Sequence, residues 1–146
     1  MNRPILTVVR GLPGSGKSTF AHYLSDRTGT MLLEPDALLM CGGVYHYTPE
    51  RYRDAVQRCF CILSSIGAEG RDIIYADVLP TIANVKAIIR AYDNFNWIDD
   101  KANVRVMDRP MITVEESLAR NAHAVRREDI ERMAKEWEPW EEKNDE

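Results

Sequence analysis

The chain has 146 residues, of which 45% are hydrophobic and 29% charged, and its formal net charge is -4. This length fits one domain, and this composition excludes disordered, collagenous and fibrous chains. No apolar run approaches the roughly 18 residues that a membrane-spanning helix requires. The first residues also lack the pattern of a secretory signal peptide. We therefore expect a cytoplasmic protein without a membrane partner.

The negative charge is concentrated in the last part of the sequence. Residues 128–146 include nine acidic and three basic residues, so the preceding part carries a small positive charge. We expect residues 1–138 to form the folded domain and residues 139–146 to form a frayed acidic tail. The three cysteines lack metal-ligand spacing, which is typical of reduced thiols in the cytoplasm.

Short apolar runs alternate with helical patterns along the chain, and glycine or proline residues separate them. Strands are predicted, in chain order, at residues 5–10, 31–34, 72–77 and 103–107. Helices are predicted at residues 17–27, 48–67, 81–92 and 113–118, followed by a last helix from residue 128. Strands that alternate with helices indicate parallel pairing, so the sequence predicts an α/β protein.

Cap residues mark two of the helix starts. Thr48 stands directly before Pro49, and Thr113 and Glu116 have the spacing of a capping box. Residues 41–47 contain paired glycines and are expected to form a loop. The helix that begins at Thr48 is expected to bury Tyr52, Val56, Cys59, Leu63 and Ile66. The last helix is expected to bury Ile130, Met133, Ala134 and Trp137.

The segment Gly11-Leu12-Pro13-Gly14-Ser15-Gly16-Lys17-Ser18 matches the phosphate-binding loop pattern at every required position. It follows a predicted strand and opens a predicted helix, which is the context that this loop needs. Small residues let backbone N–H groups converge on phosphate oxygens at a helix N-terminus. Lys17 is expected to reach the β- and γ-phosphates of ATP, and the Ser18 hydroxyl is expected to bind Mg²⁺.

Two aspartates end predicted strands at the same edge of the sheet as this loop. Asp77 is placed to hold Mg²⁺ directly or through a water molecule, and a loop-capping role is the alternative. Asp36 is placed to accept a proton from an attacking hydroxyl group in a phosphoryl transfer. The alternative for Asp36 is a cap for a short helix at residues 37–39.

Arginines cluster near the junction of the last two predicted helices. Arg120, Arg126 and Arg127 could close over a triphosphate and neutralise the charge that develops on it. For Arg126 and Arg127 an equal alternative is ion pairing with Glu128, Asp129 and Glu131. His123 lies on the same stretch, where we expect a capping or packing role.

Aromatic and basic residues mix over residues 45–58, namely Tyr45, His46, Tyr47, Arg51, Arg53 and Arg58. Such groups could stack on bases or bind phosphates. An ordinary exposed loop and a solvated helix face explain them equally well.

These motifs resemble those of the polynucleotide 5′-hydroxyl kinase branch of small P-loop kinases, which includes the kinase module of phage polynucleotide kinase-phosphatases. The resemblance rests on the loop at residues 11–19, Asp36, Asp77, Asp108-Arg109-Pro110 and the segment 116–123, and it extends over about residues 4–138. It implies a three-layer P-loop NTPase fold with a mostly parallel sheet of four to five strands. It also implies transfer of the γ-phosphate of ATP to a 5′-hydroxyl group of DNA or RNA.

The resemblance further implies the roles of individual residues. Catalysis would depend on Lys17, Asp36 and Arg120, and Mg²⁺ would be bound by Ser18 and Asp77. The residues that would bind the nucleotide are Gly11, Pro13, Gly14, Ser15, Gly16, Lys17, Ser18, Thr19 and Arg120.

The sequence departs from this family at two places that concern the acceptor. Leu39 stands where members often have an arginine for the acceptor phosphate, and Val78-Leu79 replaces a Thr-Asn pair. If the acceptor is an oligonucleotide, the nearest cations in sequence are Arg51 and Arg53. A small-molecule or nucleoside kinase is the second hypothesis, and a nucleotide-binding regulatory module is the third. The carboxylate of Asp36 argues against the third, and the oligomeric state stays open.

Overall fold

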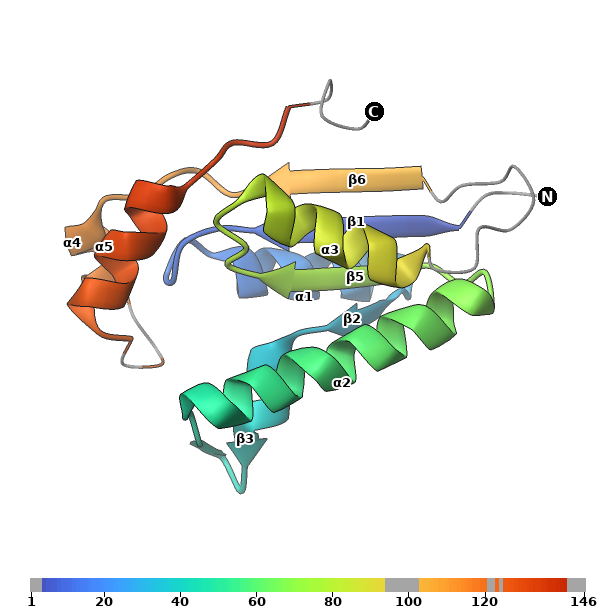
Figure 1. Cartoon of the computed structure of the whole chain (residues 1–146), viewed down its shortest axis with the longest axis horizontal. Helices are drawn as coiled ribbons and strands as arrows, with labels where there is room; N and C mark the ends of the chain where they lie inside the picture. Colours follow the sequence, from blue (N-terminus) through green and yellow to red (C-terminus); the bar gives the residue numbers. More distant parts are fainter. Residues whose placement is uncertain (1–3, 94–102, 121–122, 124, 142–146) are drawn as a thin grey trace.

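The computed structural model describes residues 4–93, 103–120, 123 and 125–141, and a parallel four-stranded sheet lies at its centre (Figure 1). The strand order is β2-β5-β1-β6. Val8 in the central strand pairs with Tyr75 on one side and with Val106 on the other. The strands are β1 (Ile5–Arg10), β2 (Met31–Leu33), β5 (Ile73–Asp77) and β6 (Asn103–Asp108). All five residues of β5 are buried, as expected for a strand covered on both faces.

Helices cover both faces of this sheet, so the predicted three-layer α/β fold is confirmed (Figure 1). One face packs against α1, and the other face packs against α2 and α3. The helices are α1 (Lys17–Thr28), α2 (Pro49–Ala68), α3 (Ile82–Tyr92), α4 (Val114–Ala119) and α5 (Arg127–Glu136), with a 3₁₀ helix, η1 (Pro35–Leu39), before α2. None of the helices in the described ranges is both long and apolar enough to cross a membrane.

The predicted elements match the observed ones to within one or two residues, and both predicted caps are present. The Thr48 hydroxyl accepts a hydrogen bond from the Arg51 N–H, and Thr113 forms its capping box with Glu116. The predicted loop at residues 41–47 instead includes a small hairpin, β3 (Met40–Cys41) and β4 (Val44–Tyr45). Gly42 and Gly43 both have positive φ, which permits the tight two-residue turn.

The inward faces of two helices differ from the prediction. Tyr52 and Val56 are only half-buried in α2, because they line a cavity rather than the core. In α5 only Ile130 is fully buried, and Trp137 lies beyond the end of the helix. The physical reason is that α5 packs against α4 and this cavity instead of lying flat on the sheet.

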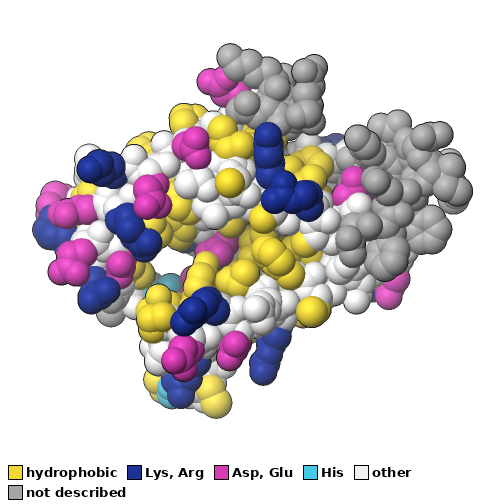
Figure 2. All heavy atoms as spheres, viewed as in Figure 1, with side chains coloured by type: hydrophobic (Ala, Val, Ile, Leu, Met, Phe, Trp, Pro, Cys, Tyr) yellow, Lys and Arg dark blue, Asp and Glu magenta, His cyan; other side chains and the backbone are white. Residues whose placement is uncertain are grey.

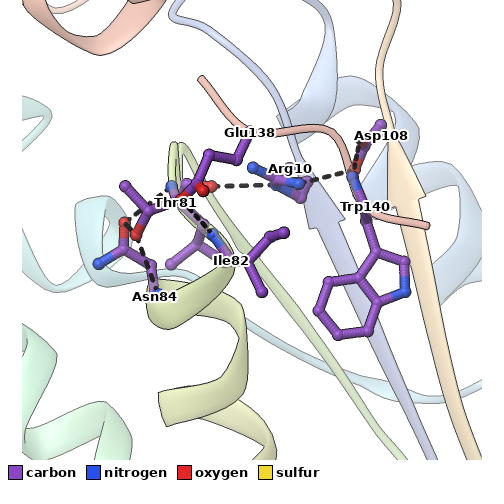
Figure 3. A network of polar contacts seen from close by, with 8 residues as sticks. Arg10, Thr81, Ile82, Asn84, Asp108, Glu138 and Trp140 are labelled. Carbon is purple, nitrogen blue, oxygen red and sulfur yellow. Dashed lines mark hydrogen bonds and ion pairs between the residues drawn. The ribbon is translucent and has the colours of Figure 1, made fainter. Parts of the chain in front are cut away.

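Residues 137–141, here called the C-terminal strap, cross the carboxyl ends of the strands (Figure 3). The Glu138 N–H donates to the Pro80 carbonyl at 2.8 Å, and the Trp140 N–H donates to Asp108 Oδ2 at 3.2 Å. Trp140 also packs against the main core cluster. Trp140 thus contacts the folded domain, and the division into a domain at residues 1–138 and a tail at residues 139–146 stays a prediction. Residues 142–146 lie outside the described part.

Arg10, the last residue of β1, lies beneath the strap and contacts it (Figure 3). Its side chain is completely buried, and its Nε donates to the Leu79 carbonyl at 3.0 Å. Its Nη1 lies 3.3 Å from Asp108 Oδ1, and its guanidinium lies 4.2 Å from the ring centroid of Trp137. Burial lowers the pKa of Arg10, and the Asp108 carboxylate opposes this effect. The strap is thus fixed to the residue that precedes the glycine-rich loop.

Candidate active site

A cavity of about 1620 Å³ lies where the carboxyl ends of the strands meet the loops. In Figure 2 the surface is hollowed between α5 and the β3–β4 hairpin. Lys17, Asp36 and Asp77 come from three separate elements, and all three line this cavity. The other predicted site residues that line it are Pro13, Gly14, Gly16, Ser18, Thr19 and Arg120. Gly11 and Ser15 are buried in the loop beneath it.

The glycine-rich loop has a backbone that suits an anion. Gly14 and Gly16 have φ values of 78° and 87°, which favour glycine. Among the described residues, no side chain caps the start of α1, and its first turn contains no acidic residue. Its first N–H groups are therefore available to phosphate oxygens. The Ser15 hydroxyl is buried without a partner among the described residues, which suits a hydrogen bond to a phosphate oxygen.

Helix α4 supports this loop from the side. The buried Ser117 hydroxyl donates to the Pro13 carbonyl at 2.6 Å. A Cβ atom on Gly14 would lie 2.8 Å from Arg120 Cβ, so the end of α4 packs directly on the loop. A Cβ atom on Gly16 would have no neighbour within 4 Å among the described residues, so this part of the loop is open.

Asp77 ends β5 and is buried at the floor of the cavity. Its Oδ2 accepts a hydrogen bond from the Tyr52 hydroxyl at 2.5 Å, and its Oδ1 accepts one from the Val78 N–H at 2.9 Å. Burial raises the pKa of Asp77, while the Tyr52 bond and the charge of Lys17 act in the opposite direction. Burial and the carboxylate also raise the pKa of Tyr52, which keeps its hydroxyl group a donor.

Asp36 lies in the first turn of η1 and is half-buried. Its Oδ1 accepts a hydrogen bond from the Tyr45 hydroxyl at 2.8 Å. Burial and this bond raise the pKa of Tyr45, so the tyrosine stays the donor. The N-cap of η1 is Glu34, so the alternative of a helix-capping Asp36 is not what the structure contains.

The arginines separate into two groups. Arg120 and Arg126 line the cavity, and their guanidinium groups lie 3.7 Å from Glu116 and 3.3 Å from Asp129, respectively. Arg127 is bound to Glu115 at 2.7 Å and does not line the cavity, so ion pairing is its observed role. The hypothesis that Arg51 and Arg53 flank the acceptor site is not supported, since both are exposed on α2 and neither lines the cavity.

Oxygen donors near the loop fit Mg²⁺. Ser18 is exposed in the cavity, and the Asp77 carboxylate lies at its floor. No group of three or more metal-binding side chains occurs within the described ranges. Mg²⁺ characteristically takes one or two protein ligands and completes its shell with phosphates and water, so this small set suffices.

Comparison with known proteins identifies the family of this chain. Residues 6–139 match a family described as an AAA domain, whose members include P-loop kinases. The chain belongs to this family. A comparison with curated proteins gives no match.

Solved structures show the same P-loop kinase fold. A chain of the Pnkp1/Rnl/Hen1 RNA repair complex is 20% identical, with a TM-score of 0.71 over 93% of this chain and 44% of that one. A sugar kinase from a Janibacter species is 16% identical, with a TM-score of 0.63 over 97% and 81%. A gluconokinase from Sinorhizobium meliloti is 16% identical, with a TM-score of 0.56 over 95% and 78%. This chain thus spans less than half of the repair-complex chain, and the likeness establishes the fold.

Three residues at this P-loop site make contacts that the sequence does not predict in detail. Ser117 lies in the predicted helix at residues 113–118 and in the segment that carries the resemblance, but the sequence predicts no contact between its hydroxyl group and the loop. The sequence predicts that Tyr52 faces the core and that His123 has a capping or packing role, and the packing of His123 is what the structure contains. The structure places both in the cavity wall, and the ring centroid of His123 lies 4.1 Å from that of Tyr45. No local signal reveals these partners, because they are distant in sequence.

Proposed function

We propose that this protein is an ATP-dependent kinase that transfers the γ-phosphate of ATP to a hydroxyl acceptor. One observation carries the proposal: Asp36, from η1, lines the same cavity as Lys17 and the glycine-rich loop. A protein that only binds a nucleotide does not need a carboxylate on the acceptor side. The family and the fold of the solved kinases support the same conclusion. We also retain the proposal of a cytoplasmic location, where ATP and Mg²⁺ are supplied.

The chain's own residues divide the work of the transfer. Lys17 and the N–H groups at the start of α1 bind and orient the β- and γ-phosphates. Ser18 and Asp77 would hold Mg²⁺, which neutralises phosphate charge when it is bound. Arg120, above Gly14, would stabilise charge that develops on the transferred group.

Asp36 is the general base in this proposal. Its Oδ1 is engaged by Tyr45, so we assign Oδ2 to the acceptor proton. The acceptor oxygen forms a bond to the γ-phosphorus while the bond from that phosphorus to the β–γ bridging oxygen breaks. The acceptor proton passes to Asp36, and ADP leaves.

For the acceptor, we propose the 5′-hydroxyl group of DNA or RNA first. The sequence motifs support it, and so does the fold shared with a chain of an RNA repair complex. The second candidate is a small-molecule or nucleoside kinase. It is favoured by Leu39, which is buried and stands where members of the polynucleotide kinase branch often have an arginine, and by the fold shared with sugar kinases.

A transfer assay with γ-labelled ATP tests the proposal. The acceptors are 5′-hydroxyl oligodeoxynucleotides, oligoribonucleotides, nucleosides and sugars, offered separately to the wild type and to Lys17→Ala. We expect label on at least one hydroxyl acceptor with the wild type and none with the variant. Binding of ATP without transfer to any acceptor would contradict the kinase proposal and favour a regulatory nucleotide-binding module.

A further inference from the structure

We propose that Tyr45, Tyr47 and His123 form a stacking site for a planar ring of the acceptor, such as a nucleobase. This inference rests on the proposed kinase function and names the substrate class of the same cavity. The aromatic surface formed by Tyr45, Tyr47 and His123 is here called the tyrosine wall. We assign recognition of the acceptor to this wall and not to cations that bind an acceptor phosphate.

The rings of the tyrosine wall are already arranged for stacking. Tyr45 and Tyr47 have ring centroids 6.3 Å apart and planes that differ by 14°. His123, from the chain between α4 and α5, places its ring centroid 4.1 Å from that of Tyr45. Tyr47 also contacts Tyr52, with centroids 6.1 Å apart. All four residues line the cavity.

Part of this wall is open to solvent. Tyr47 is 52% exposed, and Met40, on the adjacent strand of the hairpin, is 45% exposed. Large apolar groups exposed at the edge of a cavity commonly mark a binding surface. A flat aromatic ligand would cover Tyr47 and gain stacking energy that requires no hydrogen-bond partner.

The distribution of charge argues against an acceptor that is held by its own negative charge. Among the described cavity residues, the Lys and Arg side chains come only from the start of α1 and from the α4–α5 region. On the opposite side the cavity is lined by η1, the hairpin, α2 and Tyr47, which follows the hairpin. The residues concerned are Asp36, Ala37, Met40, Tyr45, Tyr47, Pro49, Tyr52, Val56 and Phe60. This set includes an anion and no lysine or arginine. A carboxylated sugar or a firmly held phosphate would lack a counter-charge here, whereas an uncharged ring would not need one.

Tyr45 connects ring binding to catalysis. Its hydroxyl group donates to Asp36 at 2.8 Å, while its ring contacts those of Tyr47 and His123. A ring stacked on this wall would therefore be placed at a fixed position relative to the general base. Tyr45 acts in this proposal as a positioning residue for Asp36, and Tyr47 as a binding residue.

The first experiment measures binding separately from transfer. Two 5′-hydroxyl oligonucleotides are compared, one with a normal 5′-terminal nucleotide and one with a 5′-terminal abasic residue, in the presence of a non-hydrolysable ATP analogue. One base–aromatic stack is worth about 1–3 kcal/mol, so we expect the abasic probe to bind about 5- to 150-fold more weakly. Equal affinity of the two probes would overturn the inference, whatever the result of the transfer assay.

Variants of the wall locate the effect. Tyr47→Leu should weaken binding of the normal probe by a similar factor and leave the abasic probe unchanged, while the control Tyr47→Phe should retain binding. If Tyr47→Leu still binds the normal probe more tightly than the abasic probe by the wild-type factor, the assignment of base binding to this wall is overturned. Loss of preference in Tyr47→Leu, together with absence of transfer by the wild type, would support the wall and reject the kinase proposal.

Kinetics then separate the two roles. In the transfer assay, Tyr45→Phe retains the ring and loses the hydroxyl group, so kcat should fall roughly tenfold or more with little change in the acceptor KM. Tyr47→Leu should raise the acceptor KM and change the ATP KM little. A Tyr45→Phe variant that changes only KM would overturn the positioning role.

Discussion

The ion pair between Arg10 and Asp108 is expected to stabilise the folded protein beneath the C-terminal strap. Arg10 is completely buried, and its only charged hydrogen-bond partner in the described chain is Asp108, at 3.3 Å. Asp108→Ala would leave a buried guanidinium with the Leu79 carbonyl and the Trp137 ring. Removing one partner of a buried ion pair costs about 3–5 kcal/mol. We expect about 3 kcal/mol, because the Asp108 side chain is 28% exposed and water can partly replace it.

Arg10→Met supplies the matched control, since it keeps a long side chain and removes the charge. It loses the hydrogen bond to Leu79 and the contact with Trp137, for which we expect about 1–2 kcal/mol. In this background Asp108→Ala no longer leaves a charge without a partner. The double variant should therefore be about 2 kcal/mol more stable than the two single effects predict together.

Urea unfolding of the four proteins at neutral pH measures this coupling. Asp108 also accepts the Trp140 N–H, but that bond is lost in both backgrounds and cancels in the cycle. Additive effects of the two substitutions, within about 0.5 kcal/mol, would contradict this prediction, because independent sites behave in that way. They would mean that Arg10 tolerates burial without Asp108.

Three further predictions concern the site. Lys17→Ala should abolish transfer without unfolding the unliganded protein, because Lys17 lines the cavity and is not part of the core; labelled transfer and thermal unfolding measure this. Asp36→Asn should lower kcat by roughly 10²–10⁴ while the ATP KM is retained, as steady-state kinetics would show. Burial raises the pKa of Asp77 above 3.8, so the folded protein retains a proton that the unfolded chain releases, and stability should fall as pH rises from about 4 towards the raised pKa. Asp77→Asn should remove this fall and stabilise the unliganded protein at neutral pH, as urea unfolding at several pH values would show.

A different result would contradict each of the three predictions for Lys17→Ala, Asp36→Asn and Asp77→Asn. Transfer by Lys17→Ala at the wild-type rate would reject the loop assignment. Equal losses in ATP affinity and rate in Asp36→Asn would place that residue among the metal or folding contacts. Parallel pH curves for the wild type and Asp77→Asn would show that the buried carboxyl does not control this part of the stability profile.

The helices, the strands and the phosphate-binding loop can be predicted from local sequence. Thr48, Pro49, Thr113 and the loop glycines act on groups within a few residues of themselves, so their effects can be predicted from neighbours in the chain. The continuous apolar runs of the strands also showed that helices would cover both faces of the sheet. The placement of Asp36 and Asp77 at one sheet edge followed from the common direction of parallel strands.

Which side chains meet at that edge depends on how the chain folds in three dimensions. Tyr45 binds Asp36, Tyr52 binds Asp77, and the ring of His123 lies against Tyr45 across 78 positions of sequence. The complete burial of Arg10 beneath Trp137 and Asp108 likewise depends on the strap, which returns to the sheet only after α5. A tyrosine or an arginine gives no local signal of its partner, because hydrogen bonding and ring packing depend on distances in space. Those distances are set by the strand order β2-β5-β1-β6 and by the path of the chain around it.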